Sequence, residues 1–171
     1  QSKVFGAPDP TFTYTSSDLT ATFTGALSRV AGEAVGTYNF TLGTLSAGSN
    51  YSLSIAAQNF VITPKPITVT ANAGQSKVFG SVDPVFTYTS SNFVAFTGAL
   101  DRVAGESVGT YAIGRGTLSA VGSNYVINFV SNNFAITAKQ VTVTANAGQS
   151  KVFGSSDPTL TYTSSDPVTF T

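Results

Sequence analysis

The sequence predicts an all-β protein, built as a linear rod from tandem copies of one small β-sandwich. The motif Gln-Ser-Lys-Val-Phe-Gly begins at Gln1, Gln75 and Gln149, each time 74 residues after the last. Self-similarity at a fixed period is the signature of a repeat array. Short runs of alternating apolar and polar residues follow one another between Gly, Asn, Asp and Pro, a pattern typical of sandwiches and small barrels.

The period divides the chain into three units. Unit one covers residues 1–64 and lacks its first strand, unit two covers residues 65–138 and is complete, and unit three covers residues 139–171 and is the N-terminal part of a copy. Unit three duplicates residues that unit one already has. In a protomer that polymerised by donating strands, this duplicated segment would be surplus. We therefore expect the chain to be a window of a longer covalent array.

Unit two shows the strand pattern most fully. Residues 67–71, Ile-Thr-Val-Thr-Ala, alternate as a half-buried strand does, and Asn72-Ala73-Gly74 reads as a turn. In residues 86–89, Phe86 and Tyr88 should share one buried face, with the two threonines outward. The remaining runs give seven or eight strands, which we interpret as an immunoglobulin-like sandwich: residues 76–79, 93–96, 109–113, 116–119, 125–130 and 134–137.

The alternative fold is a β-grasp repeat, in which residues 98–106 would form a helix across a mixed sheet. Gly105 and the shortness of this stretch argue against a full helix. The units join through Pro64-Lys65-Pro66 and Ala138-Lys139-Gln140. Linkers this short are stiff, so we expect a semi-rigid rod that advances roughly 30–40 Å per unit, the size of such a domain.

Composition excludes several classes of function. Eight Lys and Arg balance eight Asp and Glu, and only 9% of residues are charged. This balance argues against nucleic-acid partners, and no apolar run is long enough for membrane insertion. With no His and no Cys, the chain lacks the residues of most catalytic triads and zinc sites. We expect no enzyme, no cofactor and no metal site; carboxylates are too sparse for a calcium cage.

Charged residues recur at matching positions. Arg29 and Glu33 return as Arg102 and Glu106, four residues apart in a loop-like stretch, and we interpret each as an ion pair that pins its loop rather than a ligand clamp. Asp83 reads as the first residue of a turn with Pro84.

Two tyrosines also recur. Tyr38 and Tyr111 each end the motif Val-Gly-Thr-Tyr, and a tyrosine bonded to backbone, as in the tyrosine corner of sandwiches, is favoured over a sugar-stacking platform. A crosslink from Lys77 to Asn124 or Asn128 is a further possibility that the sequence leaves open.

The repeated segments ITVTANAGQSKVFG, TGALDRVAGESVGTYAI, GTLSAVGSNYVINF and FAIT resemble the MBG domains with a Tyr-Gly or Phe-Gly signature. Phe79 stands where that family often has Tyr. The resemblance implies repeats of bacterial extracellular, cell-surface proteins of the adhesin type, with no catalysis and no single ligand.

Two function classes remain open. The first is a structural segment of a long extracellular fibre or adhesin stalk, a spacer or biofilm matrix filament. Its expected partners are neighbouring repeats of the same chain, with other copies of the same fibre as a further candidate. The second is a glycan- or protein-binding module of a surface adhesin. Near-identical copies favour the structural segment, since every unit of a spacer has the same role.

Overall fold

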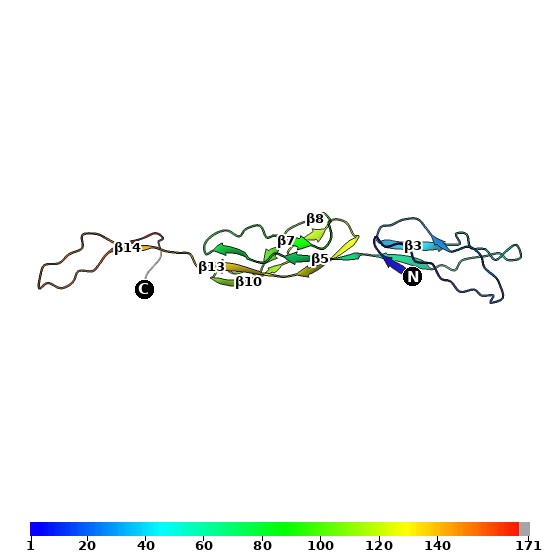
Figure 1. Ribbon diagram of the computed structural model, residues 1–171, viewed down its shortest axis with the longest axis horizontal. Helices are drawn as coiled ribbons and strands as arrows, with labels where there is room; N and C mark the ends of the chain where they lie inside the picture. Colours follow the sequence, from blue (N-terminus) through cyan, green and yellow to red (C-terminus); the bar gives the residue numbers. More distant parts are fainter. Residues whose placement is uncertain (168–171) are drawn as a thin grey trace.

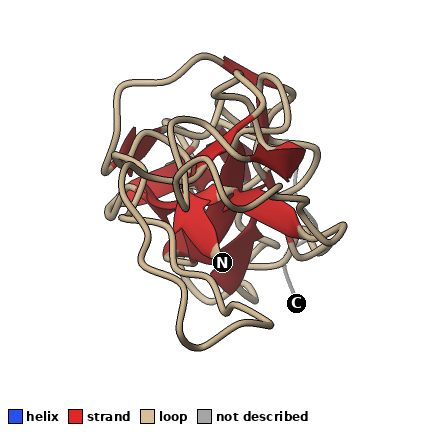
Figure 2. Ribbon diagram, turned by 90° about the vertical axis from the view of Figure 1, so that its right-hand side faces the viewer, coloured by secondary structure: helices blue, strands red, loops and turns tan. Residues whose placement is uncertain are grey.

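The computed structural model describes residues 1–167 and shows three bodies in a line, all built from strands and loops (Figure 1). Viewed along the long axis the molecule is narrow, because the units lie one behind another (Figure 2). No helix occurs among residues 1–167, and the stretch expected to be helical in a β-grasp holds the two-residue strand β9 (Asp101–Arg102) instead. Gly98 and Gly105 both have positive φ there, which a helix excludes. The β-grasp alternative is therefore wrong.

Unit two contains nine strands. Two extended segments form its long axis, the first made of β5 (Lys65–Ala71) and β6 (Gln75–Val78), the second of β12 (Tyr125–Val130) and β13 (Asn133–Thr137). The other strands are β7 (Tyr88–Ser90), β8 (Phe96–Thr97), β9, β10 (Gly109–Gly114) and β11 (Ser119–Ala120).

These strands form small sheets that share one core. One sheet has the order β6-β13-β10-β9, a second has the order β12-β5-β7, and β8 pairs with β11. Both extended segments pass from one sheet to the other, and they pair in parallel all the way: β5 with β12, and β6 with β13. The chain changes sheet at residues 72–74 and 131–132, which lie between the strands.

The core of unit two lies between these sheets. β5 contributes Val69, β10 contributes Ile113 and β13 contributes Phe134, each with 0% of its surface exposed. Leu100 and Leu118, from loops outside the two main sheets, complete the buried cluster. Apolar burial of this kind is the main source of stability for so small a domain.

Unit one repeats one of these sheets and lacks the other. Its strands β1 (Ser2–Val4), β4 (Asn59–Thr63), β3 (Gly36–Thr41) and β2 (Ser28–Arg29) lie side by side in that order. Within residues 1–64 no strand corresponds to β5, and residues 51–58 form no strand. In unit three, β14 (Val143–Ala145) pairs with β15 (Tyr162–Ser164).

The chain crosses from unit one to unit two almost without a linker. β4 ends at Thr63 and β5 begins at Lys65, with only Pro64 between them. The last strand of one unit therefore continues as the first strand of the next.

Candidate functional site

A cluster of four charged side chains lies at one end of unit two. Lys77 from β6 and Arg102 from β9 face Asp83 and Glu106, which come from the two neighbouring loops. The Arg102 guanidinium donates from Nε to Oδ2 of Asp83 at 2.6 Å and from Nη2 to Oδ1 at 3.0 Å, a bidentate pair. Lys77 Nζ lies 2.7 Å from the same carboxylate and also bonds to Glu106.

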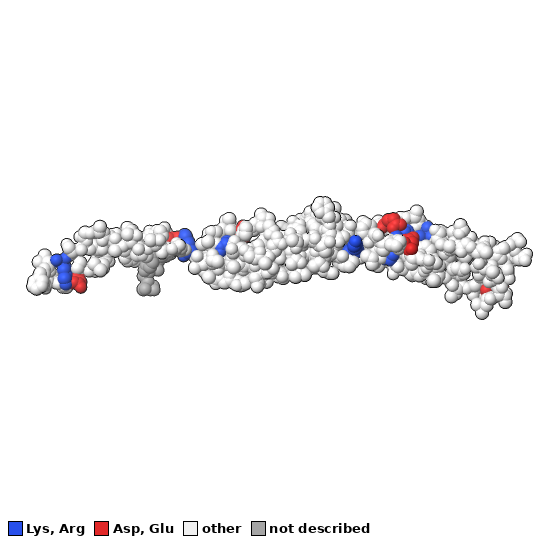
Figure 3. Space-filling model, in the orientation of Figure 1, with Lys and Arg blue, Asp and Glu red and all other residues white. Residues whose placement is uncertain are grey.

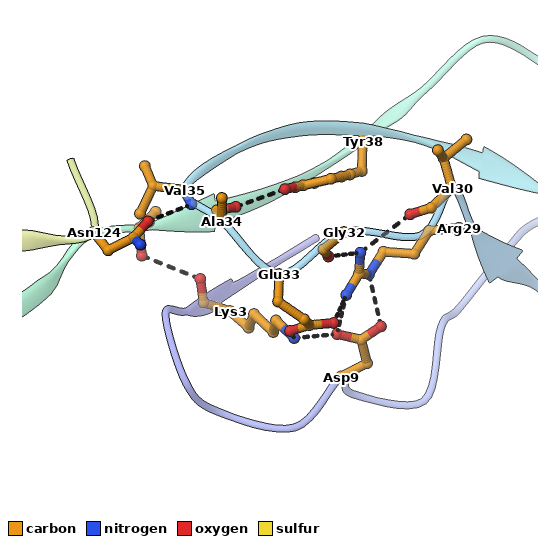
Figure 4. Close-up of polar contacts among 11 residues, drawn as sticks. Lys3, Asp9, Arg29, Val30, Gly32, Glu33, Ala34, Val35, Tyr38 and Asn124 are labelled. Atoms are coloured by element: carbon orange, nitrogen blue, oxygen red, sulfur yellow. Dashed lines mark hydrogen bonds and ion pairs between the residues drawn. The ribbon is translucent and has the colours of Figure 1, made fainter. Parts of the chain in front are cut away.

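Unit one holds the same cluster with the same geometry, drawn in Figure 4. Arg29 and Lys3 face Asp9 and Glu33, and Arg29 Nε lies 2.7 Å from Asp9 Oδ2. Two cations meet two carboxylates in each cluster, so each is formally neutral. Figure 3 shows charged side chains gathered at a few places along an otherwise uncharged surface.

The cations of the cluster are covered and the carboxylates are partly open. The side chains of Lys77 and Arg102 are 5% and 6% exposed, against 33% for Asp83 and 65% for Glu106. Covered cations need partners, and bidentate pairs are the strong form of such contacts. Hydrogen bonds from Arg102 and then from Lys77 lower the pKa of Asp83 to about 2. All four groups of the cluster are thus charged at neutral and mildly acidic pH.

The cluster also fixes the loop that leads to β10. Arg102 Nη1 donates to the carbonyl of Val103 at 3.1 Å and to that of Gly105 at 2.6 Å. Its guanidinium carbon lies 5.1 Å from the ring centre of Tyr111 and 5.3 Å from that of Phe134. One arginine therefore connects two carboxylates, two loop carbonyls and two aromatic rings.

The recurring tyrosines bond to backbone. The Tyr38 hydroxyl donates to the carbonyl of Ala34 at 2.7 Å, and the Tyr111 hydroxyl donates to that of Ser107 at 2.7 Å. A tyrosine bonded four residues upstream resembles the tyrosine corner of sandwich domains. Each hydroxyl is thus engaged within its own loop.

A glycine makes room for each of these rings. A Cβ added at Gly105 would lie 2.3 Å from Cε1 of Tyr111, and a Cβ added at Gly32 would lie 2.3 Å from Cε1 of Tyr38. Gly105 has a φ of 148°, which other residues rarely adopt. The loop, the glycine and the tyrosine therefore form one packed unit.

Four residues connect unit one with unit two. The backbone N–H of Val35 donates to Oδ1 of Asn124 at 3.0 Å, across the joint (Figure 4). The rings of Phe5 and Tyr125 meet edge to face, with centroids 5.5 Å apart. Phe5 belongs to the Phe-Gly pair of the repeat motif, so the signature aromatic lies at the contact between units.

Comparison with the far end of unit two shows what this contact covers. Phe79 and Val108 occupy the positions of Phe5 and Val35, but the structure contains no Asn-Tyr loop against them. Phe79 is 48% exposed and Val108 is 57% exposed, whereas Phe5 and Val35 are half-buried. The contact with unit two therefore covers part of Phe5 and Val35.

The structure also places the predicted core pair, Phe86 and Tyr88, and the proposed crosslink residues Lys77 and Asn124. Phe86 and Tyr88 are half-buried and pack against the core, and Phe86 meets the buried Phe134 edge to face at 5.2 Å. Lys77 lies in the ion cluster while the Asn124 amide bonds at the joint, so the structure does not bring this pair together.

Sequence reasoning missed half of the ion cluster and the whole joint. Lys3 and Asp9 were not singled out, Lys77 was considered only as a crosslink partner of Asn124 or Asn128, and Asp83 was assigned only to its turn. The available signal was recurrence, since all four charged positions are the same in both long units and unit three retains Lys151 and Asp157.

Two searches of the described residues concern metals and membranes. Within residues 1–167 no three His, Cys, Asp or Glu side chains come close enough together to hold a metal ion. The same residues contain no helix long and apolar enough to cross a membrane.

A comparison with protein families matches the MBG domain of the YGX type twice in tandem, over residues 1–61 and 67–135. No curated protein and no solved structure matches the chain. The two matched segments correspond to units one and two and cover most of the sequence. The chain therefore belongs to the MBG domain family of the YGX type.

Proposed function

We propose that this chain is a structural segment of a long extracellular bacterial fibre or adhesin stalk, in which each repeat acts as a semi-rigid spacer. The observation that carries the proposal is the joint between units one and two. A single residue, Pro64, separates the strands of the two units, and Asn124 and Tyr125 hold Val35 and Phe5 across it. A joint with directional contacts resists bending in a way that a flexible linker does not.

The fold we propose for each complete unit is a small immunoglobulin-like β-sandwich. In unit two the buried residues of β5 face those of β10 and β13, which belong to the other sheet. The backbone-bonded tyrosine adds a feature that such sandwiches share. Sandwiches in series are a common construction for extended surface proteins because each buries its own core.

The charged side chains support a structural rather than a catalytic role. Within residues 1–167, the paired cations and carboxylates of units one and two satisfy each other, and no buried side-chain polar atom is left without a partner. We propose that the chain is not an enzyme and that its partners are the neighbouring repeats. We further propose that it lies outside the cell; protease treatment of intact producing cells should then release its peptides.

Stiffness is testable by distance measurement across the joint. Thr37 in β3 and Thr110 in β10 are exposed and hold equivalent positions in the two units. The chain has no native Cys, so Thr37→Cys with Thr110→Cys gives specific spin-labelling sites. The path of β5 and β6 from Lys65 to Val78 predicts a separation of about 45 Å, at 3.3 Å per strand residue. Pulsed electron paramagnetic resonance should give one narrow distribution of the distance between the two spin labels, near that value.

Two matched double variants test whether the contacts of Asn124 and Tyr125 stiffen the joint, or whether the two units only lie close together. Asn124→Ala with Tyr125→Ala should broaden the distribution markedly, because both contacts across the joint are lost. Asn50→Ala with Tyr51→Ala changes the same residue types in the same loop of unit one, which faces no unit in this structure, and should leave the width unchanged. A broad distribution in the unaltered chain would exclude the semi-rigid spacer.

A further inference from the structure

Unit two has one long strand at the edge of a sheet. β12 is the end strand of the sheet β12-β5-β7, and it pairs with β5 over six consecutive residues without a bulge. At the start of this pairing the N–H of Lys65 donates to the carbonyl of Asn124. Because backbone groups point to alternate sides along a strand, Tyr125, Ile127 and Phe129 direct theirs away from β5. Within the described residues no further strand lies on that side to pair with them.

The apolar side chains of β12 are partly open on both faces of the sheet. On the outer face Val126 is 48% exposed and Val130 is 47% exposed. On the inner face Ile127 and Phe129 pack against the core but are only half-buried, whereas Val69 in the neighbouring strand β5 is fully buried. A strand added beside β12 would therefore cover apolar surface on both faces.

β12 lacks the features that usually keep an edge strand from pairing with another chain. Such features are charged side chains, proline, bulges, very short length or a covering loop. The edge strand β9 has two residues and carries Asp101, and β7 has three residues. At the start of β6 the Gln75 side chain bonds to both backbone groups of Thr87, so a loop lies against it. Among the edges of unit two, which the structure describes in full, β12 is the long and uncharged one.

We propose that β12 pairs with β12 of a second copy of this chain, antiparallel, about a two-fold axis at Asn128. Residues that lie opposite each other in an antiparallel pair share one face. This register places Val126 opposite Val130 of the second copy on the outer face, and Ile127 opposite Phe129 of the second copy on the inner face. The two Asn128 residues meet at the axis, and the backbone groups of 127 and 129 form the hydrogen bonds.

Three observations favour a second copy of this chain as the occupant of this edge. The strand carries no charge, so two copies meet without repulsion. Its order around Asn128 is two apolar residues on either side, which reads alike in both directions, as a two-fold contact requires. β5 runs along the long axis of the rod and β12 is parallel to it, so the second rod can lie alongside the first (Figure 1). The contact is lateral, whereas the spacer proposal rests on the joint at the end of the unit.

Paired charge variants of the full chain test the contact. Val126 and Val130 are exposed in the single rod, so a charged residue at either position leaves the core intact. Sedimentation velocity of the unaltered chain should show a monomer–dimer equilibrium. Val126→Lys with Val130→Lys places like charges opposite each other twice and should raise the dissociation constant about tenfold. Val126→Lys with Val130→Glu places opposite charges there and should restore the dimer.

Disulfide crosslinking tests the register. The chain has no native Cys, so Asn128→Cys supplies one thiol per copy. In the proposed dimer the two Cβ atoms lie about 5 Å apart, and oxidation should give a dimer on a non-reducing denaturing gel. Thr68→Cys is the matched control, because Thr68 is exposed and lies beside Asn128 but in the inner strand β5. It should stay monomeric.

Three results would overturn the proposal: a monomeric unaltered chain, equal dimerisation of the two charge variants, or equal crosslinking at the two cysteines. None of these results bears on the spacer, which is tested by the distance across the joint.

Discussion

Replacing Gly105 by alanine tests whether the packed loop beside β10 holds unit two together. The added Cβ would lie 2.3 Å from Cε1 of Tyr111 and 3.0 Å from its hydroxyl oxygen, so the ring must move. Backbone strain at a φ of 148° costs about 1–3 kcal/mol, and the tyrosine hydrogen bond adds about 1 kcal/mol. We expect Gly105→Ala to lower the free energy of unfolding by about 2–4 kcal/mol.

Hydrogen exchange read by mass spectrometry suits this measurement because it reports unit two separately from its neighbours. Peptides from β10 and β13 should lose protection by the amount given above, and peptides from unit one should not. Gly80→Ala is the matched control, since Gly80 also has a positive φ, of 84°, but a Cβ there meets no atom within 4 Å. It should cost about 1–2 kcal/mol, the strain alone.

A second variant identifies the cause. In a Tyr111→Ala background the ring is gone, so Gly105→Ala should cost only the backbone strain, about 1–3 kcal/mol. Equal losses with and without the ring would refute the reasoning, and so would equal losses from Gly105→Ala and Gly80→Ala.

Two further predictions concern the ion cluster and the core. The pKa of Asp83, held at about 2 by Arg102 and Lys77, is below its unfolded value of about 3.9, so its contribution to stability is present above pH 4 and is lost as pH falls from about 4 to 2. Acid titration followed by circular dichroism should show a shallower loss in that interval for Asp83→Asn, and an unchanged slope would contradict the assignment. Phe134→Ala should cost about 3–5 kcal/mol in urea unfolding because the ring is fully buried, while Phe93→Ala, at a fully exposed site, should change stability by less than about 0.5 kcal/mol; similar costs would mean that the core is placed wrongly.

Much of the architecture could be predicted from local sequence patterns. The alternation of apolar and polar residues in 67–71 predicted β5. Such features depend on neighbours a few residues apart, which is why they can be read from a single sequence.

Contacts between segments far apart in the sequence could not be predicted from such local patterns. Lys77 and Glu106 are 29 residues apart, and no local period indicates that they meet. The change of sheet between β5 and β6 depends on the parallel partners β12 and β13, which come much later in the chain. The joint depends on a loop of unit two reaching back to Val35, 89 residues away from Asn124.

The parallel pairing of the two long segments determines how unit two would respond to tension. A pull along the rod acts on β5 at its start and on β13 at its end, in opposite directions. The six pairs of β5 with β12 and the four of β6 with β13 lie across that line, so the force shears all of them together. Strands pulled apart from one end would instead open pair by pair, under much smaller loads. Because forced unfolding is governed by the unfolding rate, this geometry favours a unit that holds its length under drag even if its equilibrium stability is modest.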